Sequence, residues 1–440
     1  MKQSYLFVAA LGVVGTLAAA PAATAQNAAL DARIAQLAAA EEAKVIAWRR
    51  DLHAHPELGN EETRTAGIVA AHLKSLGLEV QTGVARTGVV GILRGGKPGP
   101  VVALRADMDA LPVTEASGVP FASTVKATYL GQPVGVMHAC GHDAHVAMLM
   151  GAAEVLSQVK KDLPGTIKFI FQPAEEGSLP GVEGGAKLMV KEGVLDNPKV
   201  DAIFGLHINA QTEVGNLSFR PGGEMASSDR FTIKVIGKGA HGARPWSSVD
   251  PVVTAAQIIV GLQTIVSRQV NLTDDAAVVT VGTLKGGVRY NVIPADVELS
   301  GTIRAFNKKA QEQIWAAIRR TATGIAESAG ATAEVDIVPY VPVTFNDLPL
   351  TAKMLPTLQA VAGGAAHVQE VKVNTWAEDF SLYQEKVPGV FVFVGGMRKG
   401  GDVATTADHH TAGFTLDESG FTLGVKTLAT LAADYLSLKK

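Results

Sequence analysis

The 440-residue sequence predicts an α/β protein in which a mainly parallel sheet is flanked by helices and a smaller domain is inserted into the chain. Short β-branched apolar runs between glycine and proline breakers alternate with longer helical repeats through the first half. Near residues 220–223 this rhythm changes to a mixed unit with an expected sheet of its own. A chain of this length corresponds to about two to three domains.

The helices and strands of the main domain are predicted from the spacing of apolar residues and from the glycine and proline residues that end each element. Apolar residues recur at helical spacing over residues 30–48, and Gly77 ends the next helical pattern. Helices are expected at 30–48, 63–76, 144–159 and 418–438, and strands at 89–93, 101–104, 166–171 and 200–206. Strands that alternate with helices in this way favour a doubly wound sheet.

The inserted domain is predicted to span residues 224–338, so the main domain consists of 26–223 and 339–440. Its long helix begins with Asp250 as N-cap and Pro251 at the first helical position. Strands are expected at 231–236, 277–284, 292–303 and 334–338, and helices at 251–266 and 311–327.

Composition and charge exclude several classes of protein. The 47% hydrophobic content is that of a globular chain rather than a disordered one. The 39 basic and 42 acidic residues give a net charge of −3 without a basic cluster, so no nucleic-acid partner is expected. A single cysteine excludes an internal disulfide framework.

The first 25 residues are typical of a secretory signal peptide. A positive start at Lys2 precedes an apolar stretch at 5–20, and small residues at Ala23 and Ala25 form a cleavage site. The alternative is an uncleaved membrane anchor, but the stretch is shorter than the roughly 20 residues that span a bilayer. We therefore expect cleavage after Ala25. The mature protein is expected to be periplasmic or secreted, without a stable membrane anchor.

The densest group of chemically active side chains lies at residues 138–145, which read HACGHDAH. Three histidines and the only cysteine of the chain fall within eight residues. Imidazole and thiolate are the best nitrogen and sulfur ligands that a protein offers a metal. The alternative is a buried Cys140 that acts as a small hydrophobe beside surface histidines.

Acids and a histidine follow three of the expected strands. Asp107 and Asp109 follow the strand 101–104, Glu175 and Glu176 follow 166–171, and His207 closes 200–206. Ligand sites of open α/β sheets lie at the carboxyl ends of strands. Adjacent carboxylates there can divide their roles, one binding metal and the other accepting a proton from water. Acidic turns and capping aspartates remain the structural alternative.

The segment GKGAHG at 237–242 matches a dinucleotide-binding pattern after a strand, but the helix and the acid that such a site needs do not follow. His241 in this glycine-rich loop is better suited to reach a substrate.

Together these motifs resemble the metal-dependent amidohydrolases that include hippurate hydrolase, N-acyl-amino-acid amidohydrolases and auxin-conjugate hydrolases, within the superfamily of aminoacylase and carboxypeptidase G. The resemblance runs from about Trp48 to the C-terminus. Its motifs are RDLH at 50–53, PEL at 56–58, ADMDALP at 106–112, HACGHDAH at 138–145, QPAEEG at 172–177, GLH at 205–207, GKGAHGARP at 237–245, NVIP at 291–294, GTIR at 301–304, EDFS at 378–381 and His410 four residues before Phe414.

The resemblance implies a dinuclear-metal exopeptidase-like catalytic domain that holds two divalent metal ions, zinc or manganese. The positions that match the metal ligands are Cys140, His142, Glu176, His207 and His410. Glu175 matches the catalytic base and Asp109 the aspartate that orients a ligand. His409 is the alternative to His410, because the proline that usually follows the ligand histidine is absent. Asp107 stands where relatives outside this branch have a ligand histidine.

The resemblance also implies that the inserted domain is a ferredoxin-like lid through which two copies form a homodimer. His241 would stabilise the tetrahedral intermediate, in some relatives in the partner's site. Asn291 and Arg304 are candidates to hold the substrate carboxylate, with structural roles at strand ends as the alternative.

The implied reaction is hydrolysis of the amide bond of an N-acyl or N-aminoacyl amino acid, and the implied partner is therefore a small N-acyl amino acid or dipeptide. A non-catalytic periplasmic protein that binds metal or peptide on the same fold is the alternative, although the retained base Glu175 argues against it. The second alternative is a metal-independent serine hydrolase, and the lack of a G-x-S-x-G elbow argues against it.

Overall fold

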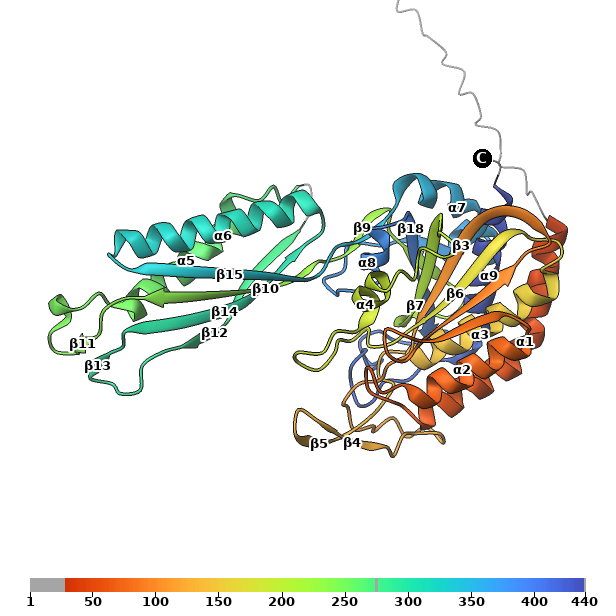
Figure 1. Cartoon of the computed structure of the whole chain (residues 1–440), viewed down its shortest axis with the longest axis horizontal. Helices are drawn as coiled ribbons and strands as arrows, with labels where there is room; N and C mark the ends of the chain where they lie inside the picture. Colours follow the sequence, from red (N-terminus) through yellow and green to blue (C-terminus); the bar gives the residue numbers. More distant parts are fainter. Residues whose placement is uncertain (1–27, 274–275, 439–440) are drawn as a thin grey trace, which may run out of the picture.

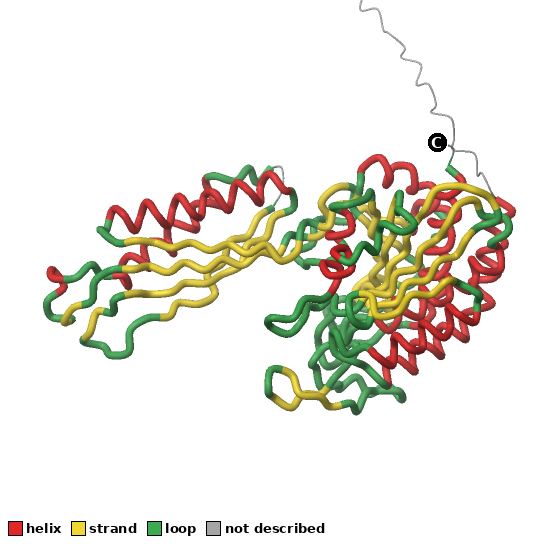
Figure 2. The backbone as a smooth tube through the Cα atoms, in the orientation of Figure 1, coloured by secondary structure: helices red, strands yellow, loops and turns green. Residues whose placement is uncertain are grey.

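The computed structural model describes residues 28–273 and 276–438, which form a larger and a smaller part (Figure 1). The expected signal peptide, residues 1–25, lies outside the described residues. Strands run from the larger part into the smaller one through a narrow crossing (Figure 2).

The larger part is built on an eight-stranded sheet in the order β1-β2-β6-β3-β7-β18-β8-β17. Its centre is parallel, because β3 pairs with β6 and β7, and β7 pairs with β18. Antiparallel pairs at β1–β2, β2–β6 and β8–β18 make the sheet mixed. The strands are β1 (Glu79–Val84), β2 (Gly88–Arg94), β3 (Lys97–Asp107), β6 (Pro164–Gln172), β7 (Ala202–Glu213), β8 (Leu217–Phe219), β17 (Val368–Glu370) and β18 (Gly389–Met397).

Helices cover both faces of this sheet. Val102 and Leu104 of β3 join the core under the helices α1, α2, α3, α7 and α9, whereas Ala103 between them joins the core under α4 and α8. Alternate side chains of one strand are thus buried on opposite faces, as a doubly wound sheet requires. The helices are α1 (Ala28–Ala54), α2 (Thr63–Ser75), α3 (His142–Val159), α4 (Gly185–Lys191), α7 (Leu348–Val361), α8 (Ser381–Gln384) and α9 (Phe421–Ser437).

The predicted α/β class with a mainly parallel mixed sheet is confirmed, while several elements, α7 and β18 among them, were not predicted. The fully buried strand β18 was not predicted, although its run of apolar residues is typical of a central strand. The strand expected at 292–303 is divided into β13 (Val292–Ile293) and β14 (Asp296–Ala305). Pro294 lies between them, and its lack of an N–H interrupts strand pairing.

The smaller part has its own antiparallel sheet in the order β12-β14-β10-β15 and its own core. Helices α5 and α6 lie together on one face of it (Figure 1). The elements are β10 (Ser228–Ile236), α5 (Pro251–Arg268), β12 (Ala277–Lys285), β14, α6 (Lys308–Ser328) and β15 (Thr332–Val341). Their βαββαβ order is that of a ferredoxin-like unit.

Helix α5 begins where the sequence predicts. The Asp250 side chain accepts hydrogen bonds from the N–H groups of Val252 and Val253, and Pro251 occupies the first position. Helix α5 is long and apolar enough to cross a membrane, and 33% of its 18 residues are buried inside the protein. Its buried residues, Ile258 and Leu262 among them, pack in the core of the small sheet, so composition alone is weak evidence for a span.

The two parts are joined by a pair of short antiparallel strands, β9 (Gly222–Met225) and β16 (Thr344–Asn346). Smaller elements complete the chain: β4 (Lys126–Tyr129) pairs with β5 (Gln132–Gly135), and β11 (Ala240–His241) pairs with β13. The predicted domain limits, 224 and 338, lie close to this crossing and stay a prediction.

Candidate metal centre

The site lies where parallel strands of the large sheet end. β3 ends at Asp107 beside Gln172 at the end of β6, and His207 lies in the adjacent β7. A cavity of about 260 Å³ opens there, lined by Cys140, Glu175, Glu176 and His207 among others. The carboxyl ends of parallel strands therefore collect the side chains that the sequence singled out.

His142 is held at the first turn of α3 with one ring nitrogen free. Its Nδ1–H donates to the Asp109 carbonyl at 2.9 Å and lies 3.2 Å from the Asp109 carboxylate. Its Nε2 is buried without a hydrogen-bond partner. Gly141 has φ 106°, and a Cβ there would lie 2.5 Å from Ile208, so the approach of this turn to β7 requires glycine.

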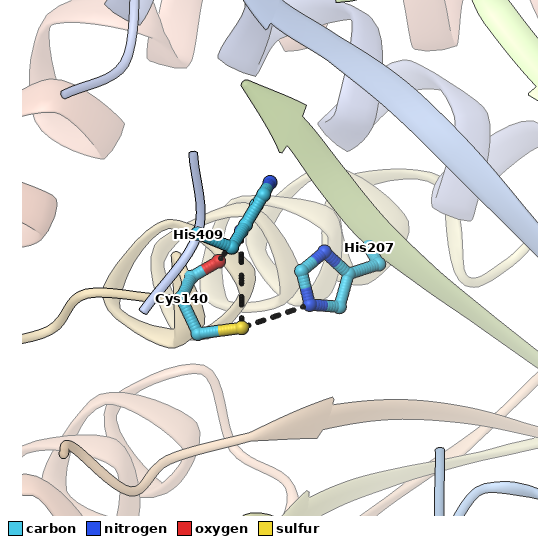
Figure 3. A group of neighbouring side chains, drawn as sticks. All are labelled: Cys140, His207 and His409. Atoms are coloured by element: carbon cyan, nitrogen blue, oxygen red, sulfur yellow. Dashed lines mark hydrogen bonds between the residues drawn. The ribbon is translucent and has the colours of Figure 1, made fainter. Parts of the chain in front are cut away.

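The thiol of Cys140 lies between histidines. Its Sγ is 3.3 Å from Nε2 of His207 and 3.3 Å from Nε2 of His410. The Nδ1–H of His207 donates to the Ile208 carbonyl at 2.7 Å, which turns its Nε2 toward the sulfur. Figure 3 shows the Cys140 thiol with two of these neighbours, His207 and His409. A metal-binding histidine usually donates its other ring N–H to a carbonyl or a carboxylate, as His207 does here.

The two neighbouring histidines 409 and 410 have different surroundings. Nε2 of His409 accepts the Ala210 N–H at 3.1 Å, so its Nδ1 carries the proton and donates to the Cys140 carbonyl at 3.0 Å. Both nitrogens of His409 thus contact backbone groups, while its Nδ1 also lies 3.8 Å from the Cys140 sulfur, in a donor group with Cys140 and His207. His410 instead places Nε2 2.8 Å from Glu176 and has φ 63°, a strained conformation for a non-glycine residue.

Asp107 is occupied by structural partners. It accepts from Arg105 at 2.6 Å and from Nδ1–H of His145 at 2.6 Å. Nε2 of His145 accepts the Ile208 N–H at 2.8 Å, so this imidazole has no free nitrogen. Asp107 thus positions, through His145, the strand that carries His207.

Glu175 is half-buried and lies in an acidic environment. Burial, reinforced by the charges of Glu378 and Glu176, raises its pKa well above the ordinary value. Its Oε1 accepts the Asp379 N–H at 3.3 Å. Glu378 and Asp379 had no predicted role beyond their place in the EDFS motif, although a pair of acids directly before Phe380 is a signal that the sequence contains. Both are paired with the buried Arg105.

The donor set fits divalent metal ions. Among the described residues, five groups of donor atoms each lie within 4.8 Å of one another. Three of them are Cys140, Glu176 and His410; Cys140, His207 and His409; and His142, Glu175 and Glu176. His142 Nε2 is a buried nitrogen without a hydrogen-bond partner, and Glu176 Oε1 approaches His410 without the geometry of a hydrogen bond. A cation between these groups would satisfy both, because thiolate, imidazole and carboxylate suit such ions.

Three predicted residues lie apart from this cluster. His241 belongs to β11, and Asn291 directly precedes β13, at the end of the smaller part that is remote from the large sheet (Figure 1). The Oδ1 of Asn291 has no hydrogen-bond partner. Arg304 lies in β14 near the crossing, where its guanidinium donates to Thr302 Oγ1 at 2.6 Å.

Metal binding should release protons. Burial, reinforced by Glu176, raises the pKa of the Cys140 thiol, and Asp107 outweighs burial to raise the pKa of His142 to about 10. At pH 7 both groups are protonated without metal, yet each must lose a proton to bind it. Apparent affinity should therefore rise about tenfold or more per pH unit around neutrality. Calorimetry of chelator-stripped protein in buffers of different ionisation enthalpy measures this.

The control is Cys140→Ser, which should release fewer protons per ion than the wild type. Binding without proton release, or an affinity that falls as pH rises, would contradict the assignment of these ligands.

Comparisons with known proteins agree with this geometry. The profile of the peptidase family M20/M25/M40 matches residues 103–434. The chain is 39% identical over 398 residues to an N-acetylcysteine deacetylase of Bacillus subtilis, covering 90% of this chain and 98% of that protein. It is 40% identical to the IAA-amino acid hydrolase ILR1-like 4 of Arabidopsis thaliana, covering 89% and 86%.

A solved structure shows the same fold. The crystal structure of the Bacillus subtilis YXEP protein, a dinuclear metal-binding peptidase of the M20 family, has a TM-score of 0.76 and 37% identity, covering 91% of this chain and 99% of that one. The fold, the donor cluster and these similarities together show that the chain is a metal-dependent hydrolase of amide bonds and belongs to the peptidase family M20/M25/M40.

Proposed function

We propose that the chain releases a free amino acid from an N-acyl or N-aminoacyl amino acid, with Glu175 as general base. The single observation that carries the proposal is the position of Glu175 within the group that also contains His142 and Glu176. A second carboxylate beside a metal-binding one is free to exchange a proton with water.

The proposed ligands are Cys140, His142, Glu176, His207 and His410, with Asp109 orienting His142. Divalent ions bound there would polarise the carbonyl and lower the pKa of water. The cysteine favours zinc and the carboxylate also suits manganese, so we propose one of these two. Positive charge in the cluster also favours the ionised form of Glu175 that a base requires, against burial and its acidic neighbours.

Glu175 then performs two proton transfers. It takes a proton from the attacking water as the C–O bond forms, and it delivers that proton to the nitrogen as the C–N bond breaks. The Asp379 N–H that contacts Glu175 Oε1 holds the carboxylate in place for both steps. The products are a carboxylic acid and a free amine.

Arg304 is proposed to hold the substrate carboxylate. Its neighbour Ile303 is buried under the helices of the small sheet, so Arg304 points to the opposite, uncovered face. That face would need to close over the cavity, which is the lid function proposed for this domain. A guanidinium fork matches a carboxylate in charge and geometry.

We also propose a homodimer formed through the small domain. Val252, Val253 and Val260 of α5 are 41%, 55% and 69% exposed, and β12 is an edge strand beside them. Pairing of two copies would cover this apolar surface. It would also offer His241 and Asn291, which are remote from their own metal centre, to the partner. Export with removal of residues 1–25 stays part of the proposal, and the intact mass of the exported protein tests it.

Glu175→Gln should keep its metal and lose about 10²–10⁴-fold in kcat, because the isosteric amide cannot accept the proton. Amino-acid release from a panel of N-acyl amino acids and dipeptides measures activity, and elemental analysis measures metal. Glu327→Gln, an exposed acid of α6, is the matched control. A metal-replete Glu175→Gln enzyme with normal turnover would remove Glu175 from the mechanism.

His410→Ala should lower the bound metal per chain, whereas His409→Ala should retain it. The reason is that His409 uses both nitrogens on backbone groups, while His410 presents Nε2 to Cys140 and Glu176. Metal content of the folded variants, checked by circular dichroism, decides between them. Loss of metal in the His409 variant alone would reverse the assignment.

Val260→Asp should convert a dimer to a monomer and lower activity, since a charge on α5 opposes burial of its apolar face. Sedimentation velocity measures the mass, with Val403→Asp, an exposed valine of the large domain, as control. A wild-type monomer with full activity would disprove both the dimer and the role of His241 in the partner's site.

A further inference from the structure

We infer that the metal centre is built for a bulky, apolar acyl group, preferably aromatic, which packs against Trp376. This inference rests on the proposed amidohydrolase function and specifies its substrate class. It assigns the two halves of the substrate to different sides of the cavity.

One wall of the cavity is apolar. Met225, Trp376 and Phe393 line it together with the metal-binding side chains. Met225 and Phe393 are buried, at 2% and 3% exposure, whereas Trp376 is half-buried and so presents part of its ring to the cavity. The Trp376 ring packs edge-on against the rings of His409 and Phe393, with ring centroids 5.5 Å and 6.5 Å apart. An aromatic wall directly beside the reacting groups favours an apolar substituent on the scissile carbonyl.

The charges of the cavity identify which half of the substrate faces this wall. Among the described residues, neither lysine nor arginine lines the cavity, while the charged carboxyl side chains of Glu378 and Asp408 do. No described side chain beside the apolar wall therefore offers the guanidinium or ammonium group that would hold the carboxylate of the amino-acid half. The neutral acyl half therefore faces Trp376, and the amino-acid half points away from it.

The size of the cavity suits a ring. Its volume is about 260 Å³, including the space around the metal donors. An apolar cavity of about 150 Å³ is enough to hold benzene. An acetyl group would leave much of the apolar wall without a contact. An aromatic ring, in contrast, can stack on the face of the Trp376 indole or pack edge-on against it.

The wall is also held rigidly at the domain crossing. The N–H of Ala226, next to Met225, donates to the carbonyls of Asn374 at 3.1 Å and Trp376 at 2.9 Å. The Trp376 N–H donates to Asn374 Oδ1 at 3.1 Å. A preorganised aromatic surface loses little entropy when a ligand packs on it.

The first test compares hydrolysis of N-benzoylglycine and N-acetylglycine by the full chain. Trp376→Ala should lower the benzoyl-to-acetyl ratio of kcat/KM by about tenfold or more, and Trp376→Phe should restore most of that ratio. If Trp376 had a purely structural role, its replacement would lower kcat/KM for both substrates equally. An unchanged ratio overturns the inference, and so does a rise in benzoyl hydrolysis, which would make Trp376 a steric barrier.

The second test measures binding without turnover. In the metal-loaded Glu175→Gln background, calorimetry with N-benzoylglycine and N-acetylglycine should show a benzoyl preference that Trp376→Ala abolishes. If the wild type hydrolyses no substrate but this preference is present, the proposed function fails and the acyl pocket stands. If hydrolysis occurs without a Trp376-dependent preference, the function stands and the pocket assignment fails.

Discussion

The convergence of donor atoms around Cys140 is the constraint on which the rest of the site depends. Its sulfur lies 3.3 Å from imidazole nitrogens of both His207 and His410, and His142 adds a buried nitrogen without a partner. Such groups are costly to bury together unless a cation shares their lone pairs. The tight turn at Gly141, the strained backbone of His410 and the orienting carbonyl of Asp109 all serve this convergence.

A buried ionic network supports the floor of the site. Arg105 is fully buried and contacts Asp107 at 2.6 Å, Glu378 at 2.9 Å and Asp379 at 3.0 Å. Isolated charges at this depth would cost several kcal/mol each, so the network is stable only when all partners are present. It links β3 to the segment that contacts Glu175, and through Asp107 and His145 it reaches the strand of His207. The proposed general base and a proposed metal-binding histidine are thus positioned by one set of charges.

The crossing between the two parts connects specificity to domain arrangement. Strand β9 leads into the small domain and ends at Met225, which is part of the apolar wall. The residue after it is hydrogen-bonded to the loop that carries Trp376. The proposed contact with the substrate carboxylate, Arg304, lies on the other side of the same crossing. The acyl group and the carboxylate of the substrate would therefore bind to surfaces on the two sides of the same crossing. Substrate binding would then depend on how the small domain is placed over the cavity.

The sequence by itself determined the α/β class, most helices and the chemical types of the metal donors, because these depend on local periodicity and on a dense motif at 138–145. Strand β18 escaped prediction because a short buried apolar run has no period of its own. Only the tertiary structure showed the different surroundings of His409 and His410, tied Asp107 to His145, and joined Met225, Trp376 and Phe393 in one wall. These depend on which backbone N–H or which ring lies opposite each side chain, and such contacts come from segments far apart in the chain.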